Sequence, residues 1–159
     1  MKRILIVLDR IEEIFLLPTI SFSVGLLFMQ VIFRHIFNNS ITWSEELARY
    51  LFIWQIWIGI SYCAKNGTHI RITLLKDLLS DKANRILEII VIIVWFGFGC
   101  FVIYQGYNVV MRIASFGQKS PALQMPMEYA YLSIPVGATL MNIRLVQNLF
   151  RLLKKEAEA

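Results

Sequence analysis

Four long apolar runs restrict the fold of this chain more than any other feature. Ile14–Phe33 and Tyr50–Ala64 contain no charged residue, and Ile86–Met111 contains only Glu88. The fourth run, Met127–Phe150, has one acidic residue at its start and one arginine near its end. A helix of about 20 residues crosses the hydrocarbon core of a bilayer. The runs therefore predict a chain that folds within a membrane.

The predicted fold class is an all-α integral membrane protein with four transmembrane helices. Hydrophobic residues make up 57% of the 159 residues and the mean hydropathy is +0.60, whereas a soluble domain is nearer about 45–50% apolar. The links are too short to fold alone, so residues 1–159 are predicted to form a single four-helix membrane domain. Its approximate spans are 12–34, 43–64, 86–111 and 126–150.

The N-terminal segment does not have the pattern of a cleavable signal peptide. Its apolar stretch, Ile4–Leu8, is followed by Asp9, Arg10, Glu12 and Glu13. A signal peptide instead needs a longer apolar region and a small-residue cleavage site. We therefore expect the first helix to remain in the mature protein.

Lysine and arginine residues predict the orientation. Twelve of the 16 lie in the N-terminal segment, in the link between the second and third helices, and at the C-terminal end. The other four are Arg34, Arg49, Arg112 and Lys119. Positive residues favour the cytoplasmic side, so both termini are expected there. The net charge of +5 is explained by this bias and by anionic lipid, which disfavours nucleic acid as a partner.

Three charged residues begin the second predicted helix, in the stretch "ITWSEELARYLFIW". Thr42 and Glu45 have the spacing of a capping box, and Ser44 is an alternative cap. Glu45 and Arg49 are four residues apart and are expected to pair. Glu46 has Tyr50 at the corresponding position and no charged partner. The unpaired charge predicts either a plain helix start or a contact with another chain.

Aromatic and apolar residues form a seam along the same helix, with spacings of 4, 3, 4 and 3 residues. Such a seam suits helix–helix packing, although lipid contact or packing within the four helices explains it equally well. The candidate partner-interface residues are Trp43, Glu45, Glu46, Leu47, Arg49, Tyr50, Trp54 and Trp57.

The link between the second and third helices and the fourth helix each carry one further signal. After the turn Asn66–Gly67, leucines and an isoleucine recur on one helical face and predict a short amphipathic helix in the membrane surface. Its apolar residues are Ile70, Leu74, Leu75, Leu78 and Leu79. Pro126 fits a helix start, and Pro135 is expected to kink the fourth helix and free the carbonyl of Tyr131.

Two segments resemble a known family. "WSEELARYLFIWQIWIGISYCAKNGTHIRITLL" and "SPALQMPMEYAYLSIPVG" are similar to signatures of the DctQ-like small membrane subunit of tripartite ATP-independent periplasmic (TRAP) transporters. The resemblance covers nearly the whole chain, and Glu128 departs from the family pattern, in which an apolar or aromatic residue is expected.

The resemblance implies a non-catalytic subunit of a sodium-coupled secondary transporter for organic acids. It also implies two partners, a large DctM-like membrane subunit and a periplasmic substrate-binding protein. The small subunit is then expected to extend the static scaffold of an elevator-type transporter and to help dock the binding protein. No cofactor is implied.

Rival functions have less support from the residues. Haem needs axial ligands at one depth, whereas His35 and His69 fall in links on opposite membrane faces. Cys63 and Cys100 both lie in predicted helices, where packing is the usual role. A small proton-coupled exporter acting alone is the alternative, but it needs a carboxylate deep in the membrane. No nucleophile–base or metal-spaced set indicates an enzyme.

Overall fold

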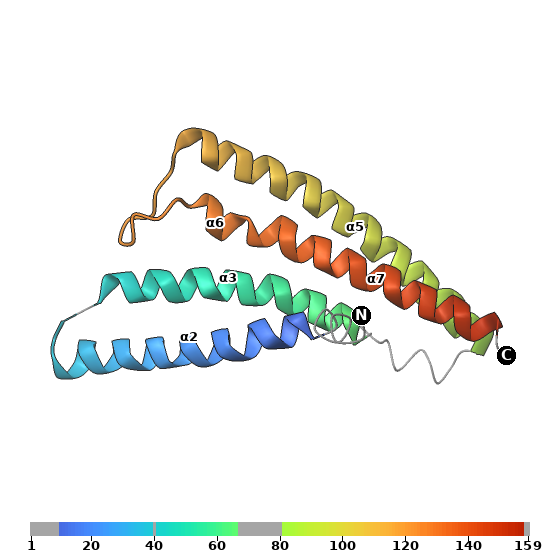
Figure 1. Ribbon diagram of the computed structural model, residues 1–159, viewed down its shortest axis with the longest axis horizontal. Helices are drawn as coiled ribbons and strands as arrows, with labels where there is room; N and C mark the ends of the chain where they lie inside the picture. The colour runs from blue at the N-terminus through green and yellow to red at the C-terminus, as the bar shows by residue number, and fades with distance from the viewer. Residues whose placement is uncertain (1–9, 40, 67–80, 158–159) are drawn as a thin grey trace, which may run out of the picture.

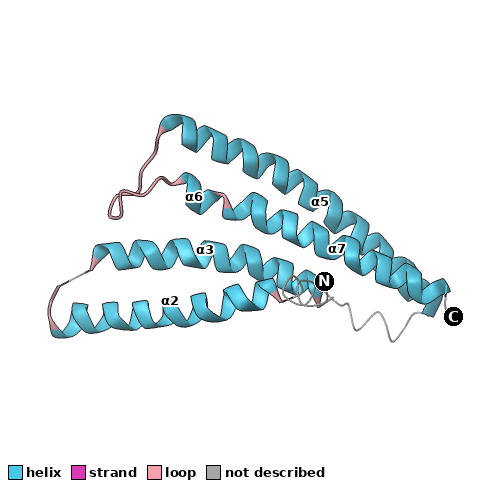
Figure 2. Cartoon of the chain, viewed as in Figure 1, coloured by secondary structure: helices cyan, strands magenta, loops and turns pink. Residues whose placement is uncertain are grey.

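The computed structural model describes residues 10–39, 41–66 and 81–157 (Figure 1). Four long helices occupy these ranges, α2 (Ile11–Ile36), α3 (Thr42–Lys65), α5 (Asp81–Phe116) and α7 (Ser133–Ala157). A single turn, α6 (Glu128–Tyr131), precedes α7. Within the described ranges no β-strand forms (Figure 2). The predicted all-α fold is therefore confirmed for these residues.

The helices lie in one layer, in the spatial order α2, α3, α7, α5. Each long helix packs mainly on its neighbours in this row, so that α3 contacts both α2 and α7, and α7 contacts both α3 and α5 (Figure 1). A single layer buries little side-chain area, and large apolar residues remain exposed on it. Examples are Leu17, Phe28, Val94 and Phe101. Exposed apolar residues of this size suit apolar surroundings.

Two of the long helices are apolar and long enough to cross a membrane, Glu12–Ile36 of α2 and Ala83–Phe116 of α5. The helices α3 and α7 lie in the middle of the layer and carry more polar residues. Among these, Gln55, Ser61, Asn142 and Arg144 are buried. Polar residues in such a position can join helices through hydrogen bonds.

Small residues allow close helix contacts at two crossings. A Cβ atom added at Gly137 of α7 would lie 2.6 Å from the Cβ of Trp57 and 2.7 Å from its backbone oxygen. Between α5 and α7, a Cβ at Gly99 would overlap the side chain of Asn142. The amide nitrogen of Asn142 lies 3.5 Å from the sulfur of Cys100. The pairs α3–α7 and α5–α7 therefore depend on glycines for their spacing.

The fourth predicted span is interrupted as Pro135 predicts. α6 ends at Tyr131 and α7 begins at Ser133, so the break falls at Leu132. Proline has no N–H to donate to the carbonyl four residues earlier, which here belongs to Tyr131. The predicted amphipathic helix, with Ile70, Leu74, Leu75, Leu78 and Leu79, lies outside the described residues.

Candidate functional site

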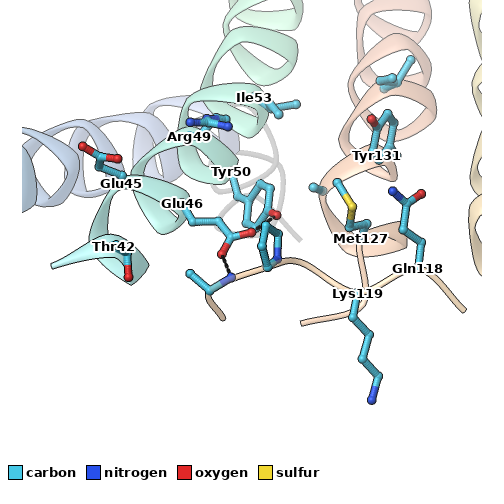
Figure 3. Close-up of a pocket in the computed structure, with 14 residues that line it drawn as sticks. Thr42, Glu45, Glu46, Arg49, Tyr50, Ile53, Gln118, Lys119, Met127 and Tyr131 are labelled. Carbon is cyan, nitrogen blue, oxygen red and sulfur yellow. Dashed lines mark hydrogen bonds between the residues drawn. The ribbon is translucent and has the colours of Figure 1, made fainter. Parts of the chain in front are cut away.

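A pocket of about 830 Å³ lies at the end of the layer where α3 begins. Its walls are the first turns of α3, the segment between α5 and α6, and the start of α7 (Figure 3). Four of the eight partner-interface candidates line it, namely Glu45, Glu46, Arg49 and Tyr50, and these include every charged candidate. The other four, Trp43, Leu47, Trp54 and Trp57, do not line it. We call this end of the layer the outer end and the opposite end the inner end.

Glu46 is the buried centre of this pocket. Its side chain is 7% exposed. One carboxylate oxygen, Oε1, accepts a hydrogen bond of 2.6 Å from the hydroxyl of Tyr50. The other, Oε2, accepts from the backbone N–H groups of Ala122 and Leu123, each at 2.8 Å (Figure 3). A buried carboxylate needs such donors, and bonds to a charged acceptor are stronger than neutral ones.

The segment that donates to Glu46 is folded back on itself. We call residues 117–127 the outer hairpin. The N–H of Ser120 donates to the carbonyl of Met125 at 2.9 Å, and the N–H of Met127 donates to that of Gln118 at 3.0 Å. Gly117 and Gln124 have positive φ angles of 59° and 54°. The hairpin therefore has a defined backbone path that starts at the end of α5.

The expected pairing of these charges is wrong. Glu45 accepts a hydrogen bond from the side-chain amide of Gln30 on α2, and no ion pair joins it to Arg49 in the part of the chain that the structure describes. Glu46 was expected to lack a partner, yet Tyr50, four residues later, is one of its donors. Both errors arise because the donors come from a tyrosine and from distant segments, which charge spacing does not detect.

The expected capping box is also absent. α3 begins at Thr42 with Ile41 as its N-cap, and no side chain caps it. Ser44, the alternative cap, instead donates its hydroxyl to the carbonyl of Ile41 at 2.8 Å. Glu45 cannot complete a capping box because its carboxylate contacts Gln30 on the neighbouring helix.

The aromatic seam is used largely within the chain. The indole N–H of Trp54 donates to the carbonyl of Tyr129 at 3.1 Å, and Trp57 packs where Gly137 brings α7 close. Leu47 is half-buried, whereas Trp43 is 47% exposed. Packing within the four helices, one of the two alternatives to a partner, therefore accounts for Trp54 and Trp57.

A second buried polar cluster lies at the inner end. Arg144 of α7 donates to both carboxylate oxygens of Glu12 on α2, through Nε at 2.7 Å and an Nη atom at 2.8 Å. The hydroxyl of Ser61, on α3 between them, donates to Glu12 at 3.1 Å. Arg144 also donates to the side-chain oxygen of Gln147 at 2.9 Å. Three helices are thus joined through one carboxylate.

Further contacts flank this inner cluster. Lys65 lies 3.3 Å from Glu13, and the amide of Asn148 donates to the carbonyl of Ala64 at 2.6 Å. The Glu12–Arg144 pair was not predicted from the sequence, because its members are 132 residues apart. The available signal in the sequence was one acid and one arginine near the same predicted side of the membrane.

The two polar clusters fix helices and a loop. Both buried carboxylates already accept several hydrogen bonds. Among the described residues, no group of three or more His, Cys, Asp or Glu side chains is placed to hold a metal ion. At each end of the layer, a buried glutamate carboxylate therefore accepts hydrogen bonds from neighbouring segments.

Comparison with known proteins gives concordant matches. Residues 23–155 match the family model of the DctQ component of tripartite ATP-independent periplasmic transporters. The sialic acid TRAP transporter small permease protein SiaQ of Vibrio cholerae is 31% identical over 151 residues, which cover 93% of this chain and 84% of that protein.

Two other relatives differ more in length. The isethionate TRAP transporter permease protein DctMQ of Oleidesulfovibrio alaskensis is 35% identical over 107 residues, covering 67% of this chain but 17% of that protein. The C4-dicarboxylate small permease protein DctQ of Rhodobacter capsulatus is 30% identical over 111 residues, 70% of this chain and 49% of that protein. By the family model and these similarities, the chain belongs to the DctQ family, the small membrane component of TRAP transporters.

Proposed function

We propose that this chain is the non-catalytic small subunit of a sodium-coupled TRAP transporter for organic acids in the inner membrane. It acts as a scaffold for a large DctM-like subunit and helps to dock a periplasmic binding protein. Family membership supports the transporter, and the similarity to the longer DctMQ permease supports a large membrane partner.

The observation that carries the scaffold role is a single helical layer fixed at both ends. Glu46 holds the outer hairpin, and the Glu12–Arg144 pair joins α2 to α7 at the inner end. Large apolar side chains remain exposed along the helices between these clusters. A layer with fixed ends and apolar faces suits a static support on which another membrane protein packs.

We further propose that all four long helices span the membrane, with both termini in the cytoplasm. α3 and α7 have 24 and 25 residues, enough for a bilayer core of about 30 Å at about 1.5 Å per residue. α5 has 36 residues, so it extends beyond the core or tilts. The lysine and arginine bias supports the orientation.

Thiol labelling in intact cells tests this orientation. A cysteine at Asn38, between α2 and α3, is expected to react with a membrane-impermeant thiol reagent. A cysteine at Asn66, after α3, is expected to be protected until the membrane is opened. The background lacks Cys63 and Cys100, the two natural cysteines. The reverse pattern of labelling would overturn the orientation.

We propose that the exposed members of the partner-interface set contact the large subunit. Trp43, Glu45 and Arg49 are exposed, so they are available to the large subunit, whereas Glu46 and Tyr50 are buried in contacts within the chain. Arg49→Glu is therefore expected to reduce co-purification of the large subunit. Arg112→Glu, an exposed arginine at the end of α5, is the matched charge-reversal control.

Reconstitution tests the proposed function directly. Proteoliposomes with this chain, the large subunit, the binding protein, a sodium gradient and an organic acid are expected to show uptake. Omitting this chain is expected to abolish uptake, and the chain alone is expected to show none. Uptake by the chain alone would instead support the exporter, and uptake without the chain would contradict the scaffold role.

A further inference from the structure

We infer that Glu46 is a positioning residue that holds the outer hairpin in the shape that a periplasmic binding protein meets. The inference rests on the proposed function, in which such a protein docks on the outer side. It goes beyond that function by assigning the docking element to residues 117–127 and its control to one carboxylate on α3.

The hydrogen bonds of the hairpin show why Glu46 matters to its tip. The base is closed by backbone bonds, and Ser120, fully buried, accepts a bond of 3.2 Å from the N–H of Met125. At the tip, the N–H groups of Ala122 and Leu123 both donate to Glu46. Removing the carboxylate leaves two backbone donors without this acceptor, which favours a different tip conformation.

The exposed surface of the hairpin suits an aqueous protein partner. Its exposed side chains are polar, small or proline, namely those of Gln118, Lys119, Pro121, Ala122, Gln124 and Pro126. Its larger apolar residues, Leu123 and Met125, are half-buried. The ammonium group of Lys119 points away from the pocket (Figure 3). Lipid or an apolar helix face would match this surface poorly, whereas a soluble protein with acidic residues would match it well.

A hairpin that is already ordered binds at a lower entropic cost. Fixing a residue's backbone costs conformational entropy, and a cost of about 1.4 kcal/mol corresponds to a tenfold change in affinity. If the tip became disordered, the binding protein would have to order it on docking. Glu46→Ala is therefore expected to raise the KM for the substrate-loaded binding protein about tenfold or more.

The first experiment measures order in the hairpin of the complete complex. A spin label is placed on Lys119→Cys, in a background without Cys63 and Cys100. Glu46→Ala is expected to increase the mobility of the label, and Glu46→Gln to restore order because an amide oxygen still accepts hydrogen bonds. Glu128→Ala is the control, since this nearby carboxylate makes no hydrogen bond with the described residues. Unchanged mobility in Glu46→Ala would overturn the inference.

The second experiment measures uptake while the binding protein is varied. Glu46→Ala is expected to raise the KM for the binding protein and to leave the maximal rate per assembled complex near that of the wild type. A purely structural role would instead reduce the amount of complex and leave this KM unchanged. An unchanged KM with a mobile hairpin would overturn the docking role.

A hairpin variant covers the case in which Glu46→Ala fails to assemble. Ala122→Pro removes one of the two donors without changing α3, and it is expected to raise the same KM. A wild-type complex whose uptake does not depend on the binding protein would contradict the proposed function itself. That result concerns the wild-type complex, whereas an unchanged KM in the variants would contradict only the positioning role of Glu46.

Discussion

The two ends of the helical layer use a buried glutamate in different ways. At the outer end, Glu46 accepts from a tyrosine and two backbone N–H groups, all of them neutral. At the inner end, Glu12 accepts from the charged guanidinium of Arg144. The outer glutamate fixes a loop, whereas the inner one joins helices. The charge of the partner therefore determines how much stability is lost when the glutamate at each end is neutralised.

Neutralising Glu12 is expected to have the largest effect. Glu12→Gln removes the buried carboxylate charge to which Arg144 donates through two nitrogens, and breaking a buried ion pair from one side costs about 3–5 kcal/mol. Thermal or denaturant unfolding of the chain in lipid nanodiscs measures the loss. The double variant Glu12→Leu with Arg144→Met removes both charges and is expected to be more stable than Glu12→Gln. Equal stability of the wild type, Glu12→Gln and the double variant would contradict a stabilising role of the Glu12–Arg144 pair.

Widening the middle of the layer is expected to have an intermediate effect. Gly137→Ala places a Cβ within 2.6–2.8 Å of three Trp57 atoms, and overpacking costs about 1–3 kcal/mol. Gly59→Ala is the control because nothing lies within 4 Å of its added Cβ. If Gly137→Ala unfolds like the control, contacts at the two ends hold α3 against α7.

Neutralising Glu46 with an isosteric amide is expected to have a smaller effect on unfolding. Glu46→Gln keeps an oxygen for Ala122 and Leu123, and no charged partner is left unpaired. Its unfolding midpoint is therefore expected to lie closer to the wild type than that of Glu12→Gln, under the same conditions. A larger loss for Glu46→Gln would reverse the comparison between the two ends.

The smallest effect is expected at Glu13, next to Glu12 in the sequence. Its side chain is 37% exposed and lies 3.3 Å from Lys65. An exposed ion pair contributes about 0–1 kcal/mol, so Glu13→Gln is expected to change the unfolding midpoint little. A fall in the unfolding midpoint as large as that of Glu12→Gln would contradict this expectation. The different burial of Glu12 and Glu13 would then not explain their contributions to stability.

The sequence predicts the helices well and the polar contacts poorly. The apolar runs are local, and each predicted span overlaps a helix in the structure, with the break before Ser133 explained by Pro135. Spacing along one helix predicted Arg49 as the partner of Glu45 and no partner for Glu46. Besides Tyr50, the donors to these two residues are Gln30, 15 residues away, and Ala122 and Leu123, 76 and 77 residues away. Such contacts depend on the order of the helices in space, which periodicity does not specify.

The separation of Glu12 from Arg144 has a consequence for synthesis of the chain. Arg144 is translated 132 residues after Glu12, which at about 5–20 residues per second is an interval of roughly 7–26 s. During that interval α2, α3 and α5 emerge while the acid still lacks its arginine. A nascent chain that stops before α7 therefore has the Glu12 carboxylate but not Arg144. This difference distinguishes an unfinished chain from a complete one.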